Sequence, residues 1–109
     1  MQYKNHIEIC GRVGAAEVRE VNGVKYARFS VVVVDTYGQN GGICVSDTWF
    51  SCVWIGIGDE DAEALQKGAV ADVSGRMRAV RYANAEGQQQ QTWEVVVKAG
   101  RVERPDGGR

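Results

Sequence analysis

Aromatic rings and guanidinium groups recur at every second position of two predicted strands. In the fourth predicted strand, Arg76, Arg78 and Tyr82 fall on one side, because side chains alternate between the two faces of a strand. In the third, Trp49 shares its side with Ser51, which indicates a partly exposed sheet surface. Flat rings stack on other flat rings, and guanidinium groups pair with anions. We therefore expect an outer sheet face suited to ligands that combine flat rings with negative charge.

Burial and solvation are the alternative explanations for such residues. Trp49 is expected to be exposed, whereas Trp93 alternates with Val95 and Val97 and is expected to point inward with them. The two arginines of the fourth strand could simply be solvated. The choice depends on whether the rings and charges gather on one surface.

The composition is that of an ordinary globular domain. The chain has 109 residues, of which 44% are hydrophobic and 25% are charged, and its formal net charge is −1. No apolar run approaches the ~20 residues of a membrane span, and residues 1–5 lack the apolar region of a signal peptide. We therefore expect one cytoplasmic domain without a membrane partner. Because the net charge is not positive, binding to nucleic acid would depend on where the positive charges gather.

Motifs for catalysis and for metal binding are missing from the sequence. The three cysteines, Cys10, Cys44 and Cys52, form no C-x-x-C pair, and His6 is the single histidine. The G-x-x-x-x-G-K-[ST], G-x-S-x-G and H-E-x-x-H motifs do not occur. We expect reduced thiols, no metal, no cofactor and no enzymatic activity.

Hydrophobic periodicity predicts five strands and one helix. The clearest strand covers residues 46–57, where Phe50, Cys52 and Trp54 share an apolar side. The other strands are expected over residues 6–14 with a short segment at 17–21, over 24–34, over 70–82, and over 92–97 with a continuation to 102. Asn22-Gly23 is the strongest turn signal, and residues 36–43 and 83–91 are expected to be hairpin tips. The helix is expected over residues 60–67, with Asp59 as its cap.

This order of elements predicts the fold. A helix between the third and fourth of five strands is the plan of the OB-fold, an all-β Greek-key barrel. We expect one OB-fold domain over residues 1–103 and a disordered end over residues 104–109. Residues 31–34 are four valines, apolar on both faces of their strand, which favours an interface with another subunit.

Several segments, in this order and spacing, resemble the bacterial single-stranded-DNA-binding proteins (SSB). The similarity covers about residues 4–103 and is carried by residues 5–14, 17–19, 22–23, 27–30, 48–53, 65–68, 73–78 and 86–97. The run Thr48-Trp49-Phe50-Ser51-Cys52-Val53, followed by Gly56, is the closest of these matches. The resemblance implies that the domain over residues 1–103 binds single-stranded DNA.

The resemblance also assigns roles to particular side chains. Tyr37, Trp49 and Tyr82 occupy the positions where the family stacks bases. Ile55 departs from the family, which usually has an aromatic there. The adjacent Trp54 could replace it if the strand were bulged, whereas regular alternation would place Trp54 in the core. The positions that the family turns toward phosphates are Arg12, Arg19, Arg28, Arg78 and Arg81, to which strand alternation adds Arg76.

The implied function is sequence-independent binding of single-stranded DNA in replication, recombination and repair. Each base stacked on an aromatic ring contributes ~1–3 kcal/mol without a sequence match, and arginines hold phosphates in a salt-dependent way. A homo-oligomer in the cytoplasm, associated with the nucleoid, is implied, with a tetramer favoured over a dimer. Replication or repair proteins are candidate partners.

The end of the sequence leaves a second function open. Members of the family usually carry a long tail with an acidic tip, whereas this sequence stops at Arg109. Either this is a trimmed domain, or it resembles the tail-less primosomal proteins of the family, which act in replication restart. In that alternative the barrel acts mainly through protein partners.

Overall fold

The computed structural model describes residues 2–105, which form five strands and one short helix. The elements are β1 (Ile7–Val21), β2 (Val24–Gln39), β3 (Gly42–Ile55), α1 (Asp59–Ala64), β4 (Val70–Ala83) and β5 (Gln89–Glu103). The strands form a closed barrel in the order β1-β2-β3-β5-β4, and β4 pairs with β1 to close it. Only β3 and β5 pair in parallel among these strands. The predicted all-β OB-fold is confirmed.

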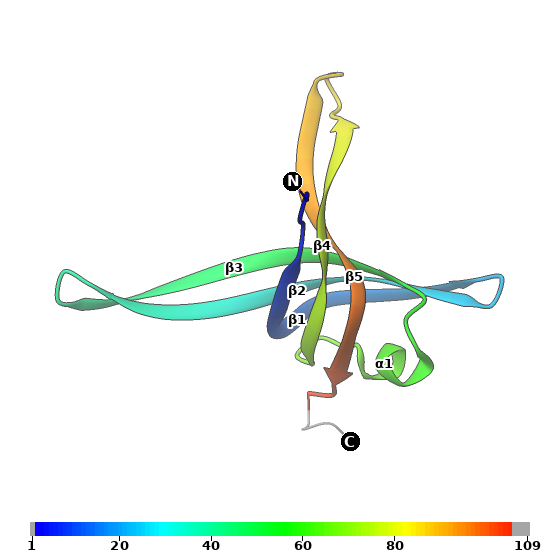
Figure 1. Ribbon diagram of the computed structural model, residues 1–109, viewed down its shortest axis with the longest axis horizontal. Helices are drawn as coiled ribbons and strands as arrows, with labels where there is room; N and C mark the ends of the chain where they lie inside the picture. The colour runs from blue at the N-terminus through cyan, green and yellow to red at the C-terminus, as the bar shows by residue number, and fades with distance from the viewer. Residues whose placement is uncertain (1, 106–109) are drawn as a thin grey trace.

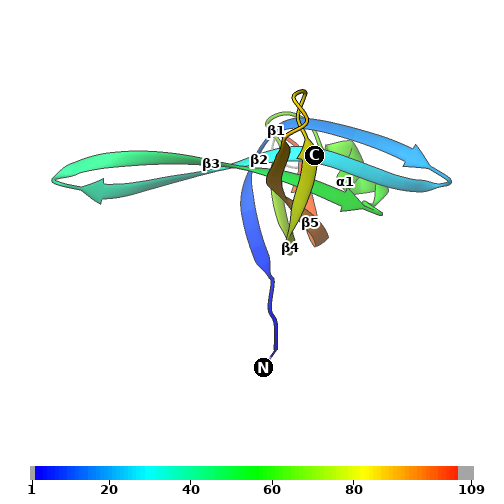
Figure 2. The same ribbon diagram turned by 90° about the horizontal axis from the view of Figure 1, so that it is seen from above.

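Three long hairpins extend beyond the barrel. The β1–β2 and β2–β3 hairpins point to opposite sides, and the β4–β5 hairpin stands away from both (Figure 1). Helix α1 lies at the other end of the barrel from the β4–β5 tip. Viewed from above, the first two hairpins lie along the long axis of the molecule (Figure 2). Each of these two ends in an Asn-Gly pair with positive φ, at Asn22-Gly23 and Asn40-Gly41, as a tight two-residue turn requires.

Two segments that the sequence predicted as interruptions lie within strands. The segment predicted as a flexible tip, residues 36–43, continues the ladder to the pair Gln39–Gly42, so only Asn40 and Gly41 form the turn. The break predicted near residue 15 is a bulge within β1, where the register shifts between Val13 and Ala16. The extent predicted for the tip was wrong, because Gly-rich sequence weakens the strand signal although cross-strand pairing holds residues 36–39 and 42–43 extended. At the bulge the sequence correctly indicated an irregularity, but β1 continues through it.

Buried apolar side chains from all five strands fill the barrel, with Val31, Val73 and Val95 fully buried. Trp54 joins this core and is 7% exposed. Regular alternation therefore continues to the end of β3, and the surface role considered for Trp54 is wrong, because a base could reach its ring only by opening the core. Its neighbour two positions earlier, Cys52, is buried as well, and burial raises the pKa of that thiol to about 12.

Helix α1 is shorter than predicted and begins one residue earlier. Gly58 precedes it and makes no side-chain cap, so Asp59 is not the cap; its carboxylate instead pairs with Lys25 Nζ at 2.9 Å. This contact raises the pKa of Lys25. The helix ends at Ala64, because Leu65 is extended and buries its side chain in the core. Gly68 has a φ of +90°, in the left-handed region that favours glycine, and its N–H donates to the Val13 carbonyl at 2.8 Å.

The end of the described chain packs against this helix. Arg104 Nη2 lies 3.6 Å from a carboxylate oxygen of Glu63. The predicted disordered end covered residues 104–109, of which 106–109 lie outside the described residues.

Candidate nucleic-acid interface

The outer face of the β1-β2-β3 sheet carries the most exposed tryptophan. Cross-strand register aligns Arg12 of β1 with Val32 of β2 and Val32 with Trp49 of β3, so the three lie on one face. Trp49 is 58% exposed, as the Ser51 beside it predicted. Its ring lies over Gly14: a Cβ added at Gly14 would lie 2.5 Å from Trp49 Cζ3. The indole is therefore supported on one side by the β1 backbone while much of its surface is free.

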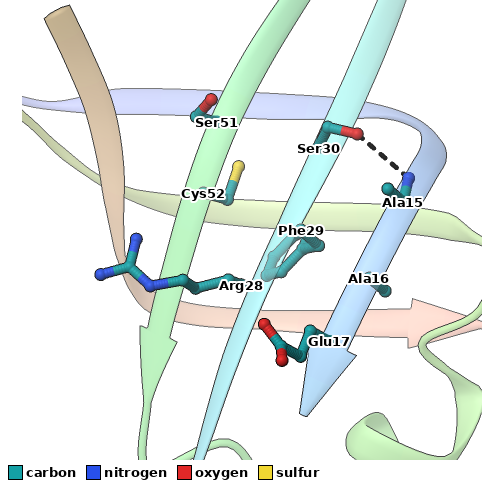
Figure 3. Close-up of a pocket in the computed structure, with 8 residues that line it drawn as sticks. All are labelled: Ala15, Ala16, Glu17, Arg28, Phe29, Ser30, Ser51 and Cys52. Atoms are coloured by element: carbon teal, nitrogen blue, oxygen red, sulfur yellow. Dashed lines mark hydrogen bonds between the residues drawn. The ribbon is translucent and has the colours of Figure 1, made fainter. Parts of the chain in front are cut away.

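A hollow adjoins Trp49 at the β1 bulge. Residues of β1, β2 and β3 line it: Ala15, Ala16, Glu17, Arg28, Phe29, Ser30, Ser51 and Cys52 (Figure 3). The Ala15 N–H donates to Ser30 Oγ at 3.1 Å, which ties the bulge to β2. Arg28 extends away from Glu17 and across β3 (Figure 3). The sheet surface beside the Trp49 indole is thus open, and the Arg28 guanidinium lies at its edge.

Arg28 and Arg78 meet at a single acid. Glu94 of β5 accepts from Arg78 Nε at 2.9 Å and from Arg78 Nη2, while Arg28 Nη1 lies 3.5 Å from its other oxygen. Glu94 is 8% exposed and is the one charged residue buried among residues 2–105. The sequence did not single it out, because alternation only places it outward beside Arg78.

The β4–β5 hairpin carries rings on both of its faces. Tyr82 is half-exposed and shares the outer face with Arg76 and Arg78, as predicted. Trp93 lies on the opposite face, where its cross-strand partner is Ala79, and it is 55% exposed. The prediction that Trp93 packs inward was wrong. Alternation gave the correct side of the strand, but at this position the hairpin has already left the barrel, so no core covers the ring.

The remaining predicted residues do not all lie on the face that carries Trp49. Tyr37 is half-exposed near the β2–β3 tip, on the opposite face of that hairpin from Trp49. Arg81 shares a face with Trp93, and its Nε lies 3.5 Å from Gln91 Oε1. Arg76 is exposed, and no ion pair involves it within the described part of the chain.

Two further arginines already have partners within the protein. Arg12 Nη1 donates to the Gly68 carbonyl at 2.8 Å, which ties β1 to the loop before β4. Arg19 donates twice to one oxygen of Glu17, at 2.8 and 3.0 Å. Arg19 and Arg28 nevertheless line one hollow with Tyr26, on the outer face toward the β1–β2 hairpin. The Arg-lined surface therefore continues beyond Trp49 in that direction.

No group of three or more His, Cys, Asp or Glu side chains suited to a metal ion occurs in residues 2–105. Over the same residues, no helix is long and apolar enough to cross a bilayer.

A closed OB-fold barrel whose hairpins carry exposed rings and arginines defines the class of OB-fold proteins equipped for single-stranded nucleic acid. The model of the "Single-strand binding protein family" matches residues 4–104. The chain belongs to that family.

Solved structures share the fold. An SSB of Plasmodium falciparum, described in complex with ssDNA, has a TM-score of 0.78 and 23% identity, over 94% of this chain and 95% of that one. A small single-stranded DNA-binding protein of Streptomyces coelicolor has a TM-score of 0.71 and 18% identity, over 97% of this chain and 100% of that one. No curated protein matches the chain in sequence.

Proposed function

We propose that this protein binds single-stranded DNA without sequence preference and without catalysis, in replication, recombination and repair. The observation that carries the proposal is the supported, open indole of Trp49 on a face that also presents Arg28. A single strand offers unpaired bases that stack on such a ring at ~1–3 kcal/mol each, whereas a duplex hides them. Membership of the family supports the same function, as do the two solved relatives, an SSB in complex with ssDNA and a small single-stranded DNA-binding protein.

The proposed roles divide between rings and charges. Trp49, Tyr37 and Tyr82 stack bases, and Trp93 adds a fourth exposed ring that the sequence did not suggest. Arg28, Arg76, Arg78, Arg81 and Arg19 hold phosphates. Arg12 has a smaller part in binding, because its guanidinium already donates a hydrogen bond to the Gly68 carbonyl.

The proposed assembly is a homo-oligomer in the cytoplasm, with a tetramer favoured over a dimer. The outer face of the β2–β3 hairpin supports an interface with another chain, because Val34, Ile43 and Val45 are exposed there. The same aliphatic residues favour the second candidate function, a replication-restart module that acts mainly through protein partners. Light scattering after size exclusion, with and without oligo-dT, gives the number of chains in each state.

Fluorescence anisotropy of labelled oligo-dT tests the proposed function. We expect saturable binding at low salt, progressively weaker binding as NaCl rises, and much weaker binding to a duplex of the same length. Equal affinity for duplex and single strand, or no binding at low salt, would contradict the proposal. If the protein does not bind DNA at low salt, a pull-down from nuclease-treated lysate tests whether it binds protein partners instead.

A further inference from the structure

The ion cluster around Glu94 joins three strands at one point of the outer face. Glu94 and Arg78 are direct cross-strand partners on β5 and β4, whereas Arg28 reaches them from β2 across β3. Parallel pairing of β3 with β5, through Val53 and Val96, brings the two halves together. The cluster therefore exists only in the closed barrel, and it holds one negative charge between two of the arginines assigned to phosphates.

The two arginines are bound unequally. Arg78 donates to Glu94 from both Nε and Nη2, and its side chain is 41% exposed. Arg28 makes a single, longer approach of 3.5 Å, and its side chain is 67% exposed. A long contact by an exposed side chain contributes little to stability, because water and salt screen it. Arg28 is therefore the arginine that can leave Glu94 at low cost.

Glu94 itself stays satisfied when Arg28 leaves. A buried carboxylate that loses every partner is strongly destabilising, but Arg78 would still donate two hydrogen bonds to this one. The other acid facing Arg28, its cross-strand neighbour Glu17, is engaged by Arg19. Arg28 is thus held by Glu94 alone among the acids that the structure places around it.

We propose that Glu94 acts as an internal competitor of DNA phosphate for Arg28, and that a bound single strand takes over this guanidinium. Carboxylate and phosphate oxygens offer a guanidinium the same acceptor chemistry. No covalent bond changes in the exchange: Arg28 gives up its ion contact with the carboxylate for one with a phosphate, and counterions leave the DNA. Glu94 therefore lowers the affinity of binding. This inference rests on the proposed function.

The test compares Glu94→Gln with the unaltered protein in binding to oligo-dT over a series of NaCl concentrations. Gln keeps the shape of the side chain and removes its charge. We expect Glu94→Gln to bind about tenfold more tightly at low salt. The slope of log affinity against log salt should stay nearly the same, because Arg28 contacts a phosphate in both complexes. Glu60→Gln, on the exposed face of α1, changes the net charge equally and should leave both quantities nearly unchanged.

Arg28→Ala identifies the group that is released. It should cost more affinity in the Glu94→Gln background than in the unaltered protein, because only there is Arg28 free of its competitor. Equal costs in the two backgrounds, or weaker binding by folded Glu94→Gln, would overturn the inference and make Glu94 a residue that positions the arginines. Absence of binding by both proteins at low salt would overturn the proposed function, and the inference with it.

A measurement on the unaltered protein covers the case in which Glu94→Gln does not fold. The Nε–H NMR signal of Arg28 should shift as oligo-dT is added, while that of Arg78 keeps the position of a hydrogen-bonded group. An Arg28 signal that stays constant through saturation would overturn the exchange.

Discussion

The indole of Trp49 occupies the space that a side chain at Gly14 would fill. A Cβ at Gly14 would lie 2.5 Å from Trp49 Cζ3 and 2.8 Å from Cη2, with Ser30 Oγ at 3.0 Å. Two segments that are separate in the sequence, the bulge of β1 and the middle of β3, thus cooperate to hold one ring at the surface. Residue 14 therefore controls the position of the principal stacking group.

Gly14→Ala should displace the indole and weaken the binding of oligo-dT. The new methyl group meets ring atoms that have to move, at a cost in unfolding free energy of about 1–3 kcal/mol, typical of overpacking. Isothermal titration with oligo-dT and urea denaturation give the two quantities. Gly38→Ala is the matched control, because the nearest atom to its Cβ is 3.7 Å away. Equal affinities of the two variants would show that Gly14 does not position the ring.

Trp49→Ala should reduce the affinity for oligo-dT by about 1–3 kcal/mol while leaving the fold intact, because the side chain is largely exposed and contributes one stacked base. Filter binding measures the affinity, and circular dichroism checks the fold. Tyr3→Ala removes another ring, 98% exposed and outside the barrel strands, and should have little effect.

Substitution by Ala should lower the free energy of unfolding much more at Trp54 than at Trp93. Trp54 is packed in the core, so its removal should lower the free energy of unfolding by about 3–5 kcal/mol. Trp93 has only Ala79 opposite it on an uncovered face, so its removal should cost less than about 1 kcal/mol. Urea denaturation of the two variants measures both costs. Similar costs would mean that the ring of Trp93 is covered, for instance by another copy of the chain.

Cys52 should be inert in the folded protein and should make stability depend on pH in the alkaline range. Burial raises the pKa of its thiol to about 12 from 9.0, so the folded state retains a proton that the unfolded state loses. The free energy of unfolding should therefore fall as pH rises from about 9 toward 12, by at most about 1.4 kcal/mol per pH unit for this group. Urea denaturation of the unaltered protein and of Cys52→Ala at several pH values isolates the contribution of this thiol to the pH dependence of the unfolding free energy.

A thiol reagent checks the same burial at neutral pH. Cys10 is exposed and Cys44 is half-buried, so both should react in the folded protein, and Cys52 only after denaturant is added. Rapid reaction of Cys52 without denaturant would contradict the closed barrel.

The sequence predicted what depends on local pattern and missed what depends on where the barrel ends. Alternation in β3 gave both the buried side of Cys52 and the exposure of Trp49, and the Asn-Gly pair at residues 22–23 gave the first turn. Trp93 was misplaced because alternation reports the side of a strand and not whether a core lies beneath it. Glu94 was missed because its burial requires Arg28 to reach across β3, a contact between segments paired only in the folded barrel.

The protein with Trp54→Phe and Trp93→Phe tests the central claim most directly, because Trp49 is then the only tryptophan. Its emission is followed while oligo-dT is added at low salt and again at high salt. If Trp49 stacks on bases beside arginines that hold phosphates, the emission should be strongly quenched at low salt, and the midpoint should move to higher DNA concentration as salt rises. Binding that leaves the emission of Trp49 unchanged at every salt concentration would contradict the account.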